Sequence, residues 1–193
     1  MLRLVHMADE RTEGDRRAGE QTDRQLLERA CDGDREALRA FYARHSRYVA
    51  GVVFRILGTD QELEDVVQET FLEALAGLHK VRDPARVRSW LASIAVRRVY
   101  RLLSRRTRRR QLADGVRETA CLGLEPEDRE FALTLYRALD EAEPRDRIAW
   151  VLHRIEGETL PDTARILGVS LATVKRRVAR VDGLVRRRLG HER

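Results

Sequence analysis

Apolar residues recur at helical spacing through most of the chain, and no strand-like alternation of useful length interrupts them. Asp34 follows Gly33 and is predicted to cap a helix that Gly58 ends, and Asp60 is predicted to cap the next one. That next helix has the cleanest period, with apolar positions that share one face: Leu63, Val66, Val67, Thr70, Phe71, Ala74, Leu75 and Leu78. The pattern predicts an all-α protein.

The helical pattern is interrupted twice, and the second interruption divides it into two small bundles. Asp83-Pro84 interrupts the first bundle locally, because proline disfavours helix at the residue before it, and helix resumes over 87–106. The period is then lost over 107–128, which contains Gly115, Gly123 and Pro126. We therefore expect a disordered leader at 1–22, a first domain at 23–106, a flexible linker at 107–128 and a second domain at 129–193. Each domain is expected to have a core of its own.

The second domain ends in the pattern of a helix-turn-helix. A short helix over 161–167 begins with proline, Gly168 supplies the turn, and Ser170 is predicted to cap a long basic helix. Leu171, Val174, Val178, Val181 and Val185 form its inner stripe. A recognition helix presents its first turns to base edges and its basic flanks to phosphates. The predicted duplex DNA contacts are Ser170, Ala172, Thr173, Lys175, Arg176, Arg177 and Arg180. The alternative is an ordinary helical hairpin with a solvated basic face.

Charge and composition narrow the function. A formal charge of +6 and a pI near 10.0 favour a nucleic-acid partner. The two cysteines, Cys31 and Cys121, lie far apart and lack zinc-site spacing, so we expect neither metal nor cofactor. No apolar run is long enough to span a bilayer and the first residues lack a secretory signal. We expect a cytoplasmic protein without membrane insertion.

An acidic helix stands directly before an arginine-rich segment. Residues 60–78 carry six acids and no Lys or Arg, whereas 80–110 carry twelve Lys or Arg and one acid. The acidic face, represented by Asp65, Gln68, Glu69 and Glu73, has three interpretations. It is a solvated surface, a metal site that would lack further ligands, or a docking surface for a basic partner protein.

The arginine segment interleaves aromatic and basic side chains. Bases of single-stranded DNA stack on aromatic rings while arginines meet the phosphates, so we predict single-strand contacts here. The candidate residues are Arg86, Arg88, Trp90, Arg97, Arg98 and Arg101, with Tyr100 in the same helix. Two alternatives remain: a tail that binds any polyanion, and a Trp90 that anchors the packing of three helices.

Three strings in order resemble the extracytoplasmic-function (ECF) RNA polymerase sigma factors of bacteria. They are Asp-Val-Val-Gln-Glu-Thr-Phe at 65–71, Ser-Trp-Leu-Ala-Ser-Ile-Ala at 89–95, and Leu-Gly-Val-Ser-Leu-Ala-Thr-Val-Lys at 167–175. The resemblance covers residues 25–190 apart from the linker. It implies that the first domain is sigma region 2, which grips the polymerase β′ clamp helices and melts the promoter −10 element. The second would be region 4, which reads the −35 element and contacts the β flap.

By this resemblance Asp65, Gln68 and Glu69 would bind core polymerase, and the loop at 81–88 would hold a flipped non-template base. An anti-sigma factor is a candidate further partner. The chain departs from the family at Val96-Arg97-Arg98, where Arg-Asn is usual, and at Pro161-Asp162-Thr163-Ala164, which is usually Glu-Ile-Ala-like. From the three matching strings we expect a sigma factor that performs no covalent chemistry.

Two rival functions remain at this stage. One is a stand-alone helix-turn-helix regulator that binds duplex DNA without polymerase, and it would leave the basic stretch at 97–110 without a role. The other is a Mg²⁺-dependent nuclease or recombinase that uses the acidic helix. No Ser, Tyr or His stands in a convincing position for a nucleophile beside a base.

Overall fold

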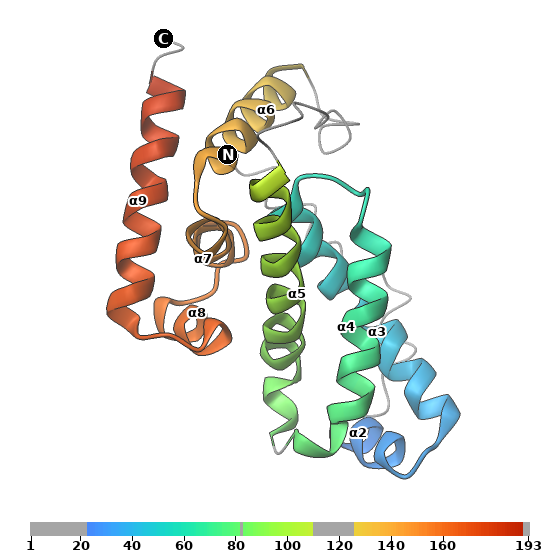
Figure 1. The fold of residues 1–193 in the computed structure, drawn as a ribbon. Helices are drawn as coiled ribbons and strands as arrows, with labels where there is room; N and C mark the ends of the chain where they lie inside the picture. Colours follow the sequence, from blue (N-terminus) through green and yellow to red (C-terminus); the bar gives the residue numbers. More distant parts are fainter. Residues whose placement is uncertain (1–22, 82, 110–125, 191–193) are drawn as a thin grey trace.

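A computed structural model describes residues 23–81, 83–109 and 126–190, and every regular element in these ranges is helical. The first half contains α2 (Asp23–Cys31), α3 (Arg35–Leu57), α4 (Leu63–Gly77), η2 (Leu78–Lys80), η3 (Pro84–Arg86) and α5 (Val87–Arg109). The second contains α6 (Pro126–Glu141), α7 (Pro144–Arg154), α8 (Leu160–Leu167) and α9 (Leu171–Gly190). In Figure 1, α5 stands between the α2–α4 helices and the α6–α9 helices. The all-α prediction is confirmed.

Most predicted helix ends are confirmed by backbone geometry. The Asp34 carboxylate accepts hydrogen bonds from the N–H groups of Glu36 and Ala37, and Gly58 ends α3 in the left-handed conformation at φ 70°. The predicted cap at Asp60 is wrong, because α4 begins three residues later. Asp60 instead lies in a turn, where its carbonyl accepts the N–H of Leu63 at 3.0 Å.

Helix α4 packs against α3 and α5 through a narrower apolar stripe than the sequence predicts. Val66, Val67, Phe71 and Ala74 are buried, and the Thr70 hydroxyl donates to the carbonyl of Val66 at 2.7 Å. The prediction for Leu75 is wrong, since 40% of that residue is exposed. The two neighbouring helices lie on one side of α4, so the flank that carries Leu75 faces outward.

The helix-turn-helix is confirmed in α8 and α9. The Thr159 hydroxyl caps α8, Gly168 makes the turn at φ 63°, and the Ser170 hydroxyl accepts the N–H of Thr173 at 3.2 Å. Val174, Val178 and Val181 are buried as predicted. The prediction for Leu171 is wrong, because it lies at the open start of α9 and is 40% exposed.

The helices on either side extend into the linker that was expected at 107–128. Helix α5 runs on through Arg109, and α6 begins at Pro126. The rest of the expected linker, 110–125, and the expected leader at 1–22 lie outside the described residues.

The expectation of separate cores is wrong, because buried side chains of both halves form one contiguous cluster. Helix α7 packs on α3 and α5, and α8 packs on α5. At the junction Arg147 of α7 donates to the carbonyl of Leu57 at 2.9 Å and to Asp140 at 2.7 Å. The Tyr136 ring lies over the backbone of Gly58, where a Cβ atom would stand 2.6 Å from the ring. The second half thus packs against the C-terminal end of α3.

Within the described residues, no helix combines the length and the apolar character that crossing a membrane requires.

The glycine at this junction gives a test of the packing. Gly58→Ala should lower the free energy of unfolding by about 2–4 kcal/mol, because left-handed strain and a clash with Tyr136 add together. Gly33→Ala is the matched control, since Gly33 is also left-handed (φ 84°) but a Cβ atom there would meet no other atom within 4 Å. We expect it to cost about 1 kcal/mol. Urea unfolding measures both, and equal losses would show that Tyr136 does not rest on Gly58.

Candidate functional site

Helix α4 presents a mixed acidic and apolar face to solvent. Asp65, Gln68 and Glu69 are exposed, as the sequence predicts. Leu72 and Leu75 stand beside them with 60% and 40% of their surface exposed. Large exposed apolar side chains within a polar rim are typical of protein–protein interfaces. The sequence interpretation placed Leu75 in the buried stripe and did not consider Leu72, so it missed both as exposed apolar residues.

The acidic face is paired along one edge with arginines of α5. Arg98 donates to Glu73 at 2.8 Å and also pairs with Glu69, while Arg97 donates to Glu73 at 2.9 Å. The hydrogen bond from Arg97, followed by that from Arg98, lowers the pKa of Glu73. A further pair of the same kind joins Arg106 to Glu62. The acidic surface and the arginine segment therefore compensate each other in part, which sequence adjacency alone did not show.

The start of α5 combines an exposed basic surface with a packed indole. Arg86 is exposed and pairs with Asp83 at 2.9 Å, and the guanidinium of Arg88 lies 4.2 Å from the ring centroid of Tyr48. Trp90 is half-buried and packs against the core, with its ring 3.4 Å from a Cβ position at Gly77. This placement favours the interpretation of Trp90 as a packing anchor. Arg101 is exposed further along α5.

The outward face of α9 carries most of the predicted duplex contacts. Ser170, Ala172, Lys175, Arg176 and Arg180 are exposed, and Thr173 is half-buried. Small side chains at the first turn leave the α9 backbone open to close approach, as a helix entering the major groove requires. The same helix therefore combines small exposed side chains at its first turn with exposed basic side chains further along.

Arg177 is placed differently from the other basic residues of α9. Its side chain is only 12% exposed and its Nε atom lies 3.7 Å from the buried carboxylate of Asp146. Burial lowers the pKa of Arg177, with Asp146 acting in the opposite direction. Arg180 approaches the other oxygen of Asp146 at 2.9 Å but remains 55% exposed. The expectation that Arg177 flanks the outward stripe is wrong, because its side chain turns inward to Asp146 of α7.

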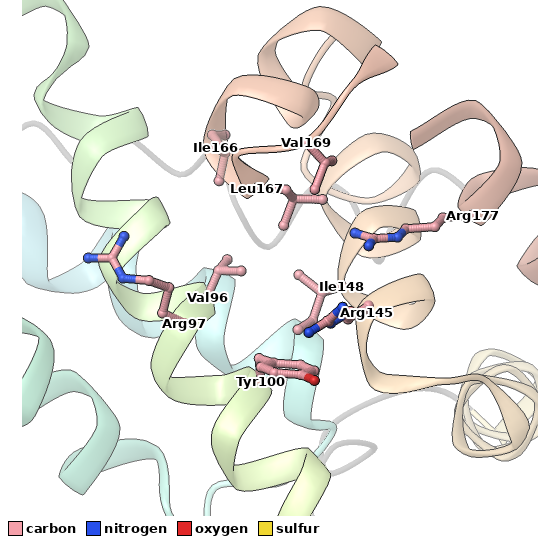
Figure 2. A pocket seen from close by; sticks show the side chains of 9 residues that line it. All are labelled: Val96, Arg97, Tyr100, Arg145, Ile148, Ile166, Leu167, Val169 and Arg177. Carbon is pink, nitrogen blue, oxygen red and sulfur yellow. The ribbon is translucent and has the colours of Figure 1, made fainter. Parts of the chain in front are cut away.

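A pocket of about 300 Å³ lies between α5, α7 and the helix-turn-helix. Figure 2 shows Arg145 and Arg177 directed toward it, while Arg97 turns its guanidinium away. Arg145 stacks over the ring of Tyr100 at 4.8 Å, and apolar side chains of both halves complete the lining. Tyr100 thus contributes to the contact between the halves.

A further ion pair joins the two halves at the turn between α7 and α8. Arg55 of α3 binds both carboxylate oxygens of Glu156, one of them at 2.8 Å. Both side chains are largely buried, with 17% and 7% exposed. Sequence reasoning missed this pair, because nothing local distinguishes two single charges 101 positions apart.

Among the described residues, His, Cys, Asp and Glu side chains nowhere gather as a group of three that could hold a metal ion. The carboxylates of the α4 face are instead engaged by arginines or point to solvent. Cys31 is exposed as a free thiol, and Cys121 lies outside the described residues.

Comparisons with known proteins agree with this geometry. The sequence matches the family Sigma-70 region 2 over residues 41–120 and the family Sigma-70, region 4 over residues 132–181. The ECF RNA polymerase sigma factor SigM of Mycobacterium tuberculosis is 31% identical over 89% of this chain and 87% of its own length. The ECF RNA polymerase sigma-E factor of Haemophilus influenzae is 28% identical over 87% of this chain and 95% of its own length.

Two solved structures share the fold. CnrH in complex with the cytosolic domain of CnrY superimposes with a TM-score of 0.61 and 25% identity, covering 90% of this chain and 100% of that one. The sigma factor RpoE of Bartonella quintana, in complex with the anti-sigma factor NepR, gives a TM-score of 0.60 over 80% of this chain and 98% of that one. The exposed faces of α4 and α9 and these matches decide between the rival functions. The chain belongs to the ECF family of RNA polymerase sigma factors, which direct RNA polymerase to promoters and initiate transcription without catalysing a reaction themselves.

Proposed function

We propose that the α4 face binds core RNA polymerase, and that α5 and α9 receive the two promoter elements. The observation that carries the docking assignment is a face on which Asp65, Gln68 and Glu69 surround the exposed Leu72. A basic helical partner with apolar side chains fits such a face, because the leucine supplies contact area and the carboxylates supply orientation. The β′ clamp helices of polymerase are the proposed partner, as the family implies.

Region 2 is proposed to hold the −10 element along the start of α5. Arg86 ends η3 directly before that helix and Arg88 lies in its first turn, and both residues are exposed. Exposed guanidinium groups bind phosphates, while the Arg88–Tyr48 stack brings an aromatic ring within reach of the same surface. Trp90 packs against the core beneath this surface and so holds the start of α5 in place. Arg97 and Arg98 would reach DNA only by exchanging their carboxylate partners on α4.

Region 4 is proposed to read the −35 element through the outward face of α9. Arg176 has the length to reach a guanine edge, and Ala172 lets the helix approach the groove. Lys175 and Arg180 would bind phosphates on either side, and Arg180 would first exchange its contact with Asp146. The β flap is the proposed polymerase contact of this region. An anti-sigma factor, the partner in the Bartonella quintana structure, is proposed as a restraint.

Run-off transcription with purified core polymerase tests the proposed division of labour. The chain should support initiation from a template with its own −35 and −10 elements and lose it when either element is scrambled. Transcription that persists after both elements are scrambled would contradict promoter reading by this chain.

Charge reversal on α4 tests the docking surface. Asp65→Arg or Glu69→Lys should weaken core polymerase binding by roughly 2–5 kcal/mol, the usual cost of breaking a close interfacial charge pair. Glu28→Lys on α2 is the matched control, because it reverses another exposed acid on a different helix. Binding is measured by titration of labelled protein with core enzyme, and circular dichroism checks the fold. Wild-type affinity in both α4 variants would rule out this face.

Three arginines of α9 separate base reading from phosphate binding. Arg176→Ala should cost roughly 1–3 kcal/mol on one upstream base pair only. Arg180→Ala should weaken all sequences about equally and reduce the salt slope by roughly one unit. Arg177→Ala removes the same charge from an inward position and should leave the affinity of folded protein nearly unchanged. A panel of −35 variants measured at several salt concentrations compares them, and a uniform loss for Arg176→Ala would defeat its assignment.

A further inference from the structure

The turn between α7 and α8 brings two acids to a basic part of region 2. Glu156 binds Arg55 through both oxygens, and Glu158 follows it after Gly157, which adopts a left-handed φ of 74°. Asp162, at the start of α8, is paired with Arg165 of the same helix. Two carboxylates close together on one turn are unfavourable unless a cation lies opposite. The segment therefore fits the arginine surface that it covers.

The turn is held rigidly in this position. The N–H of Glu156 donates to the carbonyl of Val151 and that of Glu158 to the carbonyl of Leu152, both at 3.0 Å. The carbonyl of Glu158 contacts Nδ1 of His153 at 2.8 Å. Because the backbone is fixed by α7, the carboxylates are presented to region 2 with little loss of conformational entropy.

The receiving surface on region 2 has the composition of a phosphate site. Arg55 reaches it from α3, Arg88 from α5, and the half-buried Tyr48 ring lies beneath Arg88. Burial, and next the charge of Glu158, raises the pKa of Tyr48 to about 12. Burial followed by the charges of Asp162 and Glu156 also raises the pKa of Glu158, while Arg88 acts in the opposite direction. The contact that joins the two regions at this surface is the Glu156–Arg55 ion pair, and Glu158 lies two residues further along the same turn.

A guanidinium binds a carboxylate and a phosphate with the same two-pronged geometry. We propose that Arg55 and Arg88 form a phosphate-binding site for the promoter strand, and that Glu156 occupies the Arg55 part of this site in the free protein. The proposal rests on the assignment of the −10 strand to region 2 and adds Arg55 to it. DNA can then take the site only after region 4 has moved away, so the free protein is restrained by its own acidic turn.

Two variants that break the same ion pair distinguish phosphate binding by Arg55 from the mere movement of region 4 away from region 2. Glu156→Gln frees Arg55 and leaves it available to phosphate, whereas Arg55→Ala frees Glu156 and removes the site. The probe is a fluorescein-labelled oligothymidylate of about 12 nucleotides, a length within the usual range of single-strand sites, and anisotropy reports binding without polymerase. A single strand keeps the duplex-reading face of α9 out of the measurement.

We expect Glu156→Gln to bind this probe about tenfold more tightly than wild type, the equivalent of one hydrogen bond to a charged group. Its salt slope should be steeper by about 0.7, the value for one phosphate on a single strand. Arg55→Ala should show no gain, and adding it to Glu156→Gln should cancel the gain. Glu130→Gln, an exposed acid on α6, is the control for the change in net charge.

Two results would overturn the proposal: no gain in Glu156→Gln, or equal gains in Glu156→Gln and Arg55→Ala. Circular dichroism confirms that each variant is folded. Run-off transcription by Arg86→Ala distinguishes an error in the Arg55 site from an error in the assignment of the −10 surface. If Arg86→Ala loses initiation while Glu156→Gln shows no gain in binding, only the Arg55 site is wrong. If Arg86→Ala initiates normally, the −10 surface itself is misplaced.

Discussion

The arrangement of this sigma factor depends on one buried cation at the junction of its two regions. Arg147 of α7 is 2% exposed, and its guanidinium donates to the carbonyl of Leu57 and the carboxylate of Asp140. A buried charge that loses such partners costs several kcal/mol, so the partners hold the end of α3 against α7. Gly58, directly after that carbonyl, allows Tyr136 to close over the same point. The other contacts between regions 2 and 4 follow from this alignment.

Several charged side chains are paired within the protein. Arg98 engages two carboxylates of α4, and Arg55 engages Glu156 across the regions. The proposed polymerase and promoter contacts require several of these charges to meet an external partner instead. Each such exchange subtracts the free energy of the internal contact from that of the external one. The observed affinity is therefore reduced in proportion to the fraction of protein that is in the binding-competent arrangement.

The sequence predicted the helices and the helix-turn-helix well, because caps such as Asp34 and Ser170 and turns such as Gly168 are local signals. It also assigned Asp65, Gln68 and Glu69 correctly to an exposed face. It failed where distant segments meet. Arg177 follows the basic pattern of α9 but is drawn inward by Asp146, which lies on another helix. Separate cores were expected because the helical period is lost over 107–128, but a break in the period does not exclude contacts such as that of Tyr136 with Gly58.

The distance between the two regions tests the central claim most directly. A donor dye on the exposed Cys31 and an acceptor on Glu130→Cys, in a chain with Cys121→Ser, report how α2 and α6 stand relative to each other. We expect the docked arrangement to give one narrow distribution of dye-to-dye distances in the free protein, and a distribution at longer distance once core polymerase is bound. A broad distribution in the free protein, or an unchanged one after polymerase binds, would contradict it.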